Sequence, residues 1–320
     1  MIYKHRHQPS ELPILGSLHT RMNLSSENKK YYYSLKKGWK GELLFDSFAK
    51  ELTCDCLILN NLLLSSNNTA FQIDSLIITA ETIFIYEVKN FAGDYYYESE
   101  KFYNMRGMEI LNPLHQLNRT ASLLRSMLSK QGFNLPMECK VIFINESFTL
   151  YQAPINDTVI YPTQIRKYFH KLNAIPSKST KRHRLLAEKL LELQLDDFLI
   201  KPNMPSYQYV QLQKGISCAK CHSLSVHENG RKCICTICKH EELTESAVVR
   251  AAKEFKLLFP NEKMTTGIVH DWCSIVESKR RIKYILYKKF QCRWKDTLAL
   301  LRMKQYLTNS TPVRLAYIEK

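Results

Sequence analysis

The sequence predicts an α/β protein, a mixed β-sheet flanked by helices, followed by a small cysteine-rich module and a basic all-α C-terminal module. Three observations lead to this prediction. Helix and strand patterns alternate in the order α-β-β-β-α-β between residues 41 and 200. Five of the ten cysteines crowd between Cys218 and Cys238. The 76 residues from Glu245 to Lys320 carry 16 lysines and arginines against 7 acids. The alternation of helix and strand patterns is typical of a sheet with helices on its faces.

The first half of the α/β region contains a helix, a strand and a hairpin. Apolar residues recur at helical spacing in ELLFDSFAKEL, and CLILNNLLL then reads as a strand that ends at the polar turn SSNNT. Two apolar runs, SLIIT and IFIY, flank Ala80-Glu81-Thr82 and predict a β-hairpin over residues 71–90. The segment YYYES predicts a further short strand.

The second half begins with a helix signal at Asn112-Pro113, an N-cap residue followed by proline at the first helical position. Gly132 ends this helix, and ECKVIFIN is an apolar run suited to a buried, parallel strand. A strand at TVIY and helices from Pro162 and Ser179 follow. We therefore expect a lead-in segment at 1–37, an α/β domain at 38–200, a linker at 201–213, a cysteine-rich module at 214–242 and a basic helical domain at 243–320.

Charge and composition indicate the kind of partner. The formal net charge is +16, which favours a polyanion, nucleic acid first and an anionic membrane second. The N-terminus lacks the apolar core of a signal peptide, and no apolar run is long enough for a membrane span, so we expect a cytoplasmic protein. Its cysteines should then be thiols. Those outside the cluster lie in apolar or helical patterns and are expected to be buried: Cys54, Cys56, Cys139, Cys273 and Cys292.

Three ionisable residues lie at the open end of the predicted hairpin. Glu87 and Lys89 are two apart on a strand and project to one face. A tight turn pairs residues whose numbers sum to about 162, which places Asp74 near residue 88. Two carboxylates at one end of a sheet can bind a hard divalent cation, and a lysine beside them can stabilise charge on a phosphoryl oxygen. The alternative is a solvated strand end with an ion pair.

Two further polar residues flank this group in the sequence. Glu42 opens the first predicted helix, where an acid is favourable in any case, but its neighbours at i+3 and i+7 are Phe45 and Ala49, so it borders the buried face. Gln116 lies in the first turn of the helix that begins at Asn112-Pro113, where ordinary surface polarity would also explain it.

These residues carry a resemblance. The segments Gly-Trp-Lys-Gly-Glu at 38–42, Gln-Ile-Asp at 72–74, Glu-Val-Lys-Asn at 87–90 with Gly93, and Asn-Pro-Leu-x-Gln at 112–116 resemble, in order and spacing, the nuclease-related domain (NERD) of the PD-(D/E)XK nuclease superfamily. The resemblance covers about residues 30–200. Several short motifs in the right order are more specific than any one of them.

The resemblance implies a restriction-endonuclease-like fold and cleavage of DNA that depends on Mg²⁺ or Mn²⁺. It gives Glu42, Asp74 and Glu87 the role of acidic site residues, with Asp74 and Glu87 as metal ligands, Lys89 as the catalytic lysine and Gln116 as a supporting polar group. The chain departs from the superfamily pattern at Ile73. The superfamily's name-giving motif has a proline at this position, directly before the aspartate. A proline there contributes backbone shape rather than chemistry.

The cysteine cluster has the spacing of a zinc ribbon. Cys218-x2-Cys221 and Cys235-x2-Cys238 stand thirteen residues apart, with a turn signal at Asn229-Gly230 between them. Four thiolates make a closed, structural site for one Zn²⁺. Cys233 is surplus, because its use would break the Cys-x-x-Cys spacing. The alternative is a set of redox or unligated thiols.

The region after Thr244 is expected to form three helices, in TESAVVRAAKEFKLLFP, MTTGIVHDWCSI and ESKRRIKYILYKKF. They resemble a helix-turn-helix whose last helix presents basic residues for nucleic acid. The basic residues expected to contact nucleic acid are Lys279, Arg280, Arg281 and Lys283. A three-helix packing module with a solvated basic face would account for the same pattern.

Three functions compete on this reading. The first is a metal-dependent nuclease that acts on DNA. The second is a non-catalytic DNA-binding or regulatory protein with a vestigial nuclease fold. The third is a protein-binding scaffold that uses the zinc ribbon.

Overall fold

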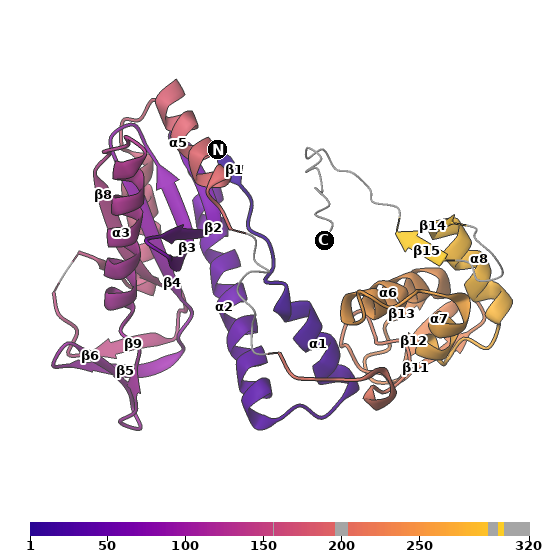
Figure 1. Ribbon diagram of the computed structural model, residues 1–320. Helices are drawn as coiled ribbons and strands as arrows, with labels where there is room; N and C mark the ends of the chain where they lie inside the picture. Colours follow the sequence, from indigo (N-terminus) through magenta and orange to yellow (C-terminus); the bar gives the residue numbers. More distant parts are fainter. Residues whose placement is uncertain (156, 196–203, 294–299, 304–320) are drawn as a thin grey trace. The chain divides into compact units, whose positions relative to one another are not determined.

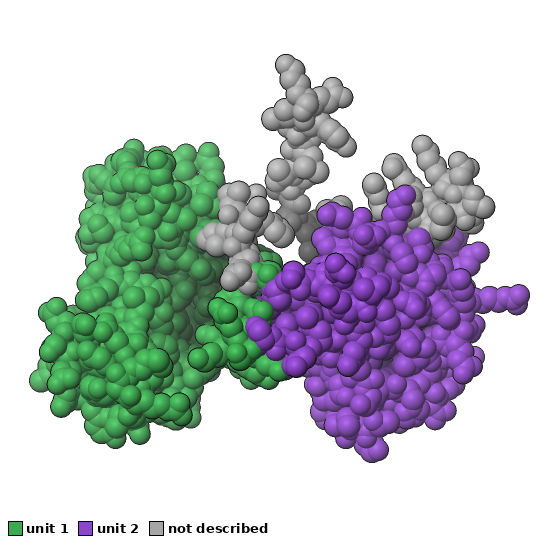
Figure 2. All heavy atoms as spheres, turned by 60° about the horizontal axis from the view of Figure 1, so that its bottom comes forward, with its two compact units in different colours: residues 1–12, 26–204 green, residues 13–25, 205–320 purple. Residues whose placement is uncertain are grey.

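The computed structural model describes residues 1–155, 157–195, 204–293 and 300–303. The chain divides into two compact units (Figure 2). Unit 1 comprises Met1–Leu12 and Ser26–Met204, and unit 2 comprises Pro13–Ser25 and the chain from Pro205 onward. The helix α1 (Glu11–Arg21) therefore begins in unit 1, while most of its residues belong to unit 2.

Unit 1 is built on a six-stranded mixed sheet in the order β1-β2-β3-β4-β8-β10 (Figure 1). Strands β2, β3 and β4 are antiparallel neighbours, whereas β1 joins β2, and β8 joins β4 and β10, in parallel. The strands are β1 (Ile2–Lys4), β2 (Leu57–Ser66), β3 (Thr69–Ile78), β4 (Ile83–Lys89), β8 (Met137–Phe143) and β10 (Val159–Ile160). This confirms the predicted mixed sheet and the parallel strand at ECKVIFIN.

Helices cover both faces of this sheet. One apolar core lies between the sheet and helices α3 (Pro113–Lys130) and α5 (Lys181–Glu192). The other lies between the sheet and helices α2 (Ser26–Lys50) and α4 (Ile165–Asn173), the latter preceded by a 3₁₀ turn at Pro162–Gln164. Over most of their length, alternate residues of the strands enter the two cores, as the period of a strand requires.

The hairpin of β3 and β4 has nearly the predicted register. Ser75 pairs with Tyr86 and Ile78 with Ile83, so paired numbers sum to 161 instead of about 162. The turn closes where expected, with the Thr79 amide donating to the Thr82 carbonyl at 3.0 Å. The β2–β3 turn uses Asn67 and Asn68, whose φ values of 50° and 59° are tolerated by asparagine in a tight two-residue turn.

Strand β3 separates from β4 at Asp74. Their pairing ends at Ser75, although β4 itself continues in register with β8 to Lys89. On the neighbouring strand, Asn61 lies at the level of Asp74 and has a left-handed backbone with φ of 53°. The alternation of both strands is reset at this level, because Ile73 and Leu76 face the same core. The separation leaves the Val88 amide without a strand partner on β3.

The helix α3 begins as its sequence predicts. The Asn112 side chain accepts a hydrogen bond from the Leu114 amide at 2.9 Å, and Pro113 occupies the first helical position. Gly132 ends the helix with φ of 78°, a conformation that glycine adopts without strain.

Two parts of unit 1 were not predicted. A second sheet, in the order β7-β6-β5-β9, lies beside the main one and contains the expected strand at YYYES. Its strands are β5 (Gly93–Glu98), β6 (Lys101–Asn104), β7 (Glu109–Ile110) and β9 (Phe148–Tyr151). The short strand β1 adds the N-terminal segment to the main sheet, and the Met1 ammonium donates to the Cys56 carbonyl at 2.6 Å.

Unit 2 contains a three-stranded antiparallel sheet and three helices that pack on one another. The strands are β11 (Val226–Asn229), β12 (Lys232–Cys235) and β13 (Glu241–Leu243), and a 3₁₀ turn at Tyr209–Gln211 precedes them. The helices are α6 (Thr244–Leu258), α7 (Thr266–Cys273) and α8 (Lys279–Lys289), close to the three predicted segments. As expected, Ile282, Ile285 and Leu286 are buried.

The α1 helix is held in unit 2 by Arg21, whose side chain is fully buried. Its guanidinium forms an ion pair with Glu254 at 2.7 Å, donates to the carbonyls of Gln213 and Gly215, and lies 4.0 Å from the centroid of the Trp272 ring. Such complete pairing is what allows a charge to be buried.

The expectation that the chain is helical throughout from Thr244 is wrong after Lys289. Strands β14 (Phe290–Arg293) and β15 (Leu300–Met303) form an antiparallel pair. Apolar and polar residues alternate in Phe-Gln-Cys-Arg, which is the period of a strand. Residues 304–320 lie outside the described part of the chain, as does the side chain of Cys292.

Only some of the cysteines that were expected to be buried are fully buried. Cys56 and Cys273 are buried, while Cys54 and Cys139 are half-buried. All the cysteines whose side chains are described are free thiols.

A glycine lets α2 approach the end of β4. A Cβ placed on Gly41 would lie 2.6 Å from the Cβ of Asn90 and 3.2 Å from a methyl carbon of Ile144. Asn90 also donates to the Lys37 carbonyl at 2.7 Å, which fixes the helix at this height. Gly38, one turn earlier, has no atom within 4 Å of such a Cβ.

We expect Gly41→Ala to lower the free energy of unfolding by about 1–2 kcal/mol, because overpacking outweighs the gain in helix propensity. The matched variant Gly38→Ala should raise it by about 0.5–1 kcal/mol, since only the propensity gain applies. Urea unfolding followed by circular dichroism measures both. Equal effects of the two substitutions would contradict the close approach.

Candidate functional site

The predicted acidic residues line a single cleft in unit 1. The cleft has a volume of about 600 Å³, and Glu42, Asp74, Glu87, Lys89 and Gln116 all contribute to its wall. They come from α2, β3, β4 and α3, which meet at the end of the sheet where β3 leaves β4. The structure thus brings together all five residues named from the sequence.

Lys89 is held between an acid and an amide. Its ammonium lies 2.6 Å from Glu87 Oε1 and donates to Gln116 Oε1 at 3.1 Å. Glu87 and Lys89 project to the same side of β4 as expected, toward α3. Glu87 is only 3% exposed, so this ion pair lies at the floor of the cleft.

Asp74 uses the amide that the separated strands leave unpaired. Its Oδ2 accepts a hydrogen bond from the Val88 amide at 2.8 Å. This bond turns the carboxylate toward the end of β4 and fixes it beside Glu87. The unusual backbone at this level of the sheet therefore serves to position Asp74.

The carboxylates are crowded enough to perturb one another. Burial raises the pKa of Glu87 to about 8, with a further contribution from the charge of Asp74, while Lys89 acts in the opposite direction. Burial and the charge of Asp74 likewise raise the pKa of Glu42 to about 7. Burial also raises the pKa of Asp74, against the hydrogen bond from Val88. A cluster of this kind favours an added cation.

An arginine that the sequence analysis missed completes the site. The Arg6 side chain is 1% exposed, and its guanidinium binds Glu42 Oε2 at 2.7 Å and both carboxylate oxygens of Asp46 at 3.0 Å. Glu42 and Asp46 are one helical turn apart on α2, so one arginine can bind both. The only signal in the sequence is this acidic pair at i and i+4, which does not identify its partner.

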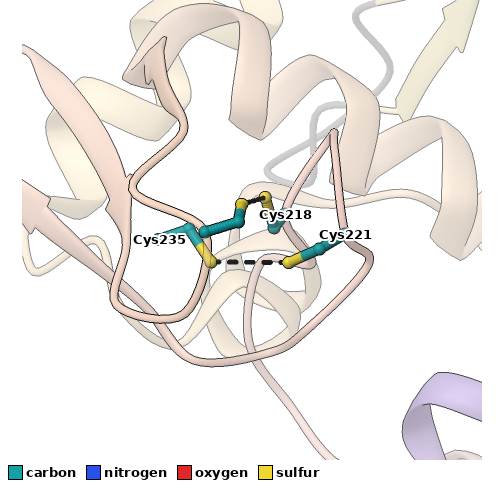
Figure 3. Close-up of side chains that lie close together, drawn as sticks. Cys218, Cys221 and Cys235 are labelled. Atoms are coloured by element: carbon teal, nitrogen blue, oxygen red, sulfur yellow. Dashed lines mark hydrogen bonds between the residues drawn. The ribbon is translucent and has the colours of Figure 1, made fainter.

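Four cysteines of unit 2 converge in the manner of a metal site (Figure 3). The Sγ atoms of Cys218, Cys221, Cys235 and Cys238 all lie within 4.8 Å of one another, and Figure 3 shows the first three of these side chains pointing toward one another. Cys218 and Cys238, and likewise Cys221 and Cys235, are 3.6 Å apart. Tetrahedral coordination at a Zn–S distance of ~2.3 Å separates the sulfurs by roughly 3.8 Å. The cluster fits a zinc-ribbon-like module, with β11 and β12 as its hairpin.

Two neighbouring cysteines of β12 have different surroundings. Backbone N–H groups of Cys238 and Ile237 lower the pKa of Cys235 to about 7. The buried Cys233 instead lies 3.8 Å from Thr244 Oγ1, outside the cluster.

The four basic residues proposed on α8 divide into two kinds. Lys279, Arg280 and Lys283 are exposed. The Arg281 guanidinium is engaged within unit 2, where it binds Glu228 at 2.5 Å and the Gly230 carbonyl at 2.7 Å, and so links α8 to the β11–β12 turn.

Comparison with known families supports the interpretation of unit 1. The nuclease-related domain (NERD) matches residues 37–144, which include Glu42, Asp74, Glu87, Lys89 and Gln116. Residues 37–144 are therefore similar to a nuclease-related domain. Comparison with curated proteins and with solved structures gives no match. Among the described residues, no helix combines the length and the apolar character needed to cross a membrane.

The NERD match begins at residue 37, so Arg6 lies outside it although its guanidinium binds Glu42, which lines the cleft. We expect Arg6→Ala to lower the free energy of unfolding by about 3–5 kcal/mol, because it leaves the buried carboxylate of Asp46 and the partly buried one of Glu42 without their cation. Arg6→Lys should restore part of this, since lysine keeps the charge but not the bidentate geometry.

Thermal or urea unfolding measures these changes. Arg182→Ala is a suitable control, because Arg182 is exposed and its single hydrogen bond to the Gly132 carbonyl is long, at 3.3 Å. A loss no larger than that of the control would contradict a structural role for Arg6.

Proposed function

We propose that this protein is a metal-dependent nuclease that hydrolyses phosphodiester bonds in DNA. One observation carries the proposal: Asp74, Glu87 and Lys89 meet in one cleft of a nuclease-related domain, with Glu42 and Gln116 beside them. The reaction joins a water oxygen to phosphorus and breaks the bond to one ester oxygen, which leaves as an alcohol after taking up a proton.

The acidic residues suit a hard divalent cation. Asp74 and Glu87 offer carboxylate oxygens, which are the ligands that Mg²⁺ and Mn²⁺ prefer. Burial raises the pKa of both carboxyl groups and so disfavours their ionised forms. A bound cation would stabilise these ionised forms. When bound, such an ion would supply Lewis-acid stabilisation of the phosphoryl group and a water of lowered pKa.

Lys89 is the side chain best placed to act on the substrate. Glu87 and Gln116 hold its ammonium at the cleft floor, where it can stabilise negative charge on a phosphoryl oxygen. Glu42 is bound by Arg6, so we assign it to shaping the charge of the site, with Asp74 and Glu87 as the metal ligands.

Unit 2 would then retain the polyanion. The exposed basic residues near the start of α8 include Lys279, Arg280 and Lys283, and we propose that they contact phosphates. Arg281 would support them indirectly by fixing α8 to the ribbon hairpin. We further propose that the ribbon holds one structural Zn²⁺, because four thiolates leave no open coordination position.

The variant Asp74→Asn should lower the rate of Mg²⁺-dependent cleavage by at least about 100-fold, because the site loses a charged ligand while keeping the acceptor for the Val88 amide. Lys89→Ala should lower the rate by about 10²–10³-fold. Nicking of supercoiled plasmid, with and without chelator, measures both.

Glu81→Gln is the matched control, since Glu81 is an exposed acid at the opposite end of the same hairpin. Full activity of Asp74→Asn would show that the site is wrongly assigned. Salt-sensitive binding by wild-type protein that never cuts DNA would instead favour the non-catalytic alternative.

The zinc assignment can be tested on two cysteines of one strand. Cys233 and Cys235 are both 1% exposed and two residues apart on β12, but only Cys235 belongs to the cluster. We expect one zinc per chain in Cys233→Ser and a loss of zinc in Cys235→Ser, as measured by mass spectrometry of the metal content. The reverse result would remove Cys235 from the ligand set.

A further inference from the structure

The first half of α2 differs in character from the second half. Between Lys29 and Lys40 it carries five lysines, three tyrosines and a tryptophan, and no acidic residue. The two acids that meet Arg6, Glu42 and Asp46, lie in the second half. Nothing in the site described above uses the basic and aromatic residues of the first half.

One stripe of this half faces the cleft. Tyr31, Leu35, Gly38 and Glu42 follow one another at spacings of four, three and four residues, and all line the cleft. Lys37 also lines it and is exposed. At a rise of 1.5 Å per residue, the stripe from Tyr31 to Glu42 is about 16 Å long. The helix thus forms a wall that leads from a tyrosine and a lysine to the acidic residues.

The chemistry of this wall suits a nucleic-acid strand. A lysine can bind a phosphate, and an exposed tyrosine ring offers a face on which a base can stack. Tyr31 is 37% exposed, and burial together with the charge of Glu11 raises the pKa of its hydroxyl, so the ring is neutral at ordinary pH. Glu11 and the acids at the floor of the cleft repel an anion. A phosphate is therefore best held on the side of the cleft that carries Lys37.

The size of the cleft indicates which form of strand can enter. A volume of about 600 Å³ is that of a pocket for a drug-sized molecule, enough for one or two nucleotides. Glu87 lies at the floor and is 3% exposed, so a phosphodiester must enter the cleft to reach it. Stacking on Tyr31 also requires a base that is not paired.

We propose that the first half of α2 binds the substrate strand and that this strand is unpaired, with Lys37 on a phosphate and Tyr31 stacked on a base. This inference rests on the proposed nuclease function and extends it to the form of the substrate. It places substrate contacts in unit 1, separate from the basic residues of α8.

Binding by the full chain tests the inference without relying on cleavage. A fluorescent single-stranded DNA 20-mer and its duplex are titrated in the presence of chelator. We expect Tyr31→Ala to weaken binding of the single strand by about 5- to 100-fold. A plot of log Kobs against log salt concentration has a negative slope. Lys37→Ala should reduce the magnitude of this slope by about 0.7.

Two matched controls lie on the same helix. Tyr33 and Lys40 are exposed and do not line the cleft, so Tyr33→Ala and Lys40→Ala should leave single-strand binding at the cleft unchanged. A single strand that carries 5-iododeoxyuridine is also irradiated on the wild-type protein, and the cross-linked peptide is identified. We expect a cross-link at Tyr31.

The outcomes are distinct. Cross-links confined to other segments, with Tyr31→Ala binding like the wild type, would overturn the inference even if the protein cuts DNA. If the protein binds duplex more tightly than single strand, and Tyr31→Ala weakens this duplex binding, the proposal that the substrate strand is unpaired would be overturned. If the protein cuts no DNA, a Tyr31 cross-link with weaker binding by Tyr31→Ala still supports the strand-binding face, and only the nuclease proposal fails.

Discussion

The organisation of unit 1 depends on keeping three carboxylates close together and largely out of water. Each buried ion costs several kcal/mol unless it is paired, and Asp74, Glu42 and Glu87 also repel one another. The chain compensates with two cations and one amide: Arg6 on Glu42, Lys89 on Glu87, and the Val88 N–H on Asp74. The three compensating groups act on different acids, so the loss of any one leaves a specific charge unbalanced.

Backbone geometry is what makes this arrangement possible. Strand β3 leaves β4 after Ser75, and the left-handed Asn61 lies at the same level of β2. The separation frees the Val88 amide for Asp74 and opens the cleft between β4 and its surroundings. Gly41 then lets α2 come close to Asn90, which brings Glu42 to the same place. A regular sheet with an ordinary helix contact would hold these acids apart.

Much of this could be predicted from local patterns. The hairpin register placed Asp74 beside Val88 within one residue, and Asn112-Pro113 marked the start of α3, because both features depend on neighbours in the sequence. The four-cysteine spacing likewise identified the cluster. The supporting role of Gln116 came only from the family resemblance, and in the structure its side chain accepts a hydrogen bond from Lys89.

What could not be predicted depends on distant contacts. Arg6 reaches Glu42 and Asp46 across 36 and 40 residues, and it lies two residues beyond a three-residue strand that has no periodicity to detect. The assignment of residues 13–25 to unit 2 depends on the burial of Arg21 against Glu254, more than 200 residues away. The pair β14–β15 was missed because its alternating pattern is only four residues long and follows a strongly helical segment.

The distribution of charge in unit 1 follows from the same constraint. A cluster of carboxylates repels a phosphodiester, so the attraction that brings a polyanion to the cleft must come from cations nearby. Charges act over only about 8 Å at physiological ionic strength, which limits how far such cations can be from the acids. Lys37 is five residues from Glu42 on α2, about 7.5 Å along the helix axis, and so lies within this range. The net charge of +16 describes the whole chain, but under the proposed function a phosphate at the acidic site would be held by the few lysines that lie beside it.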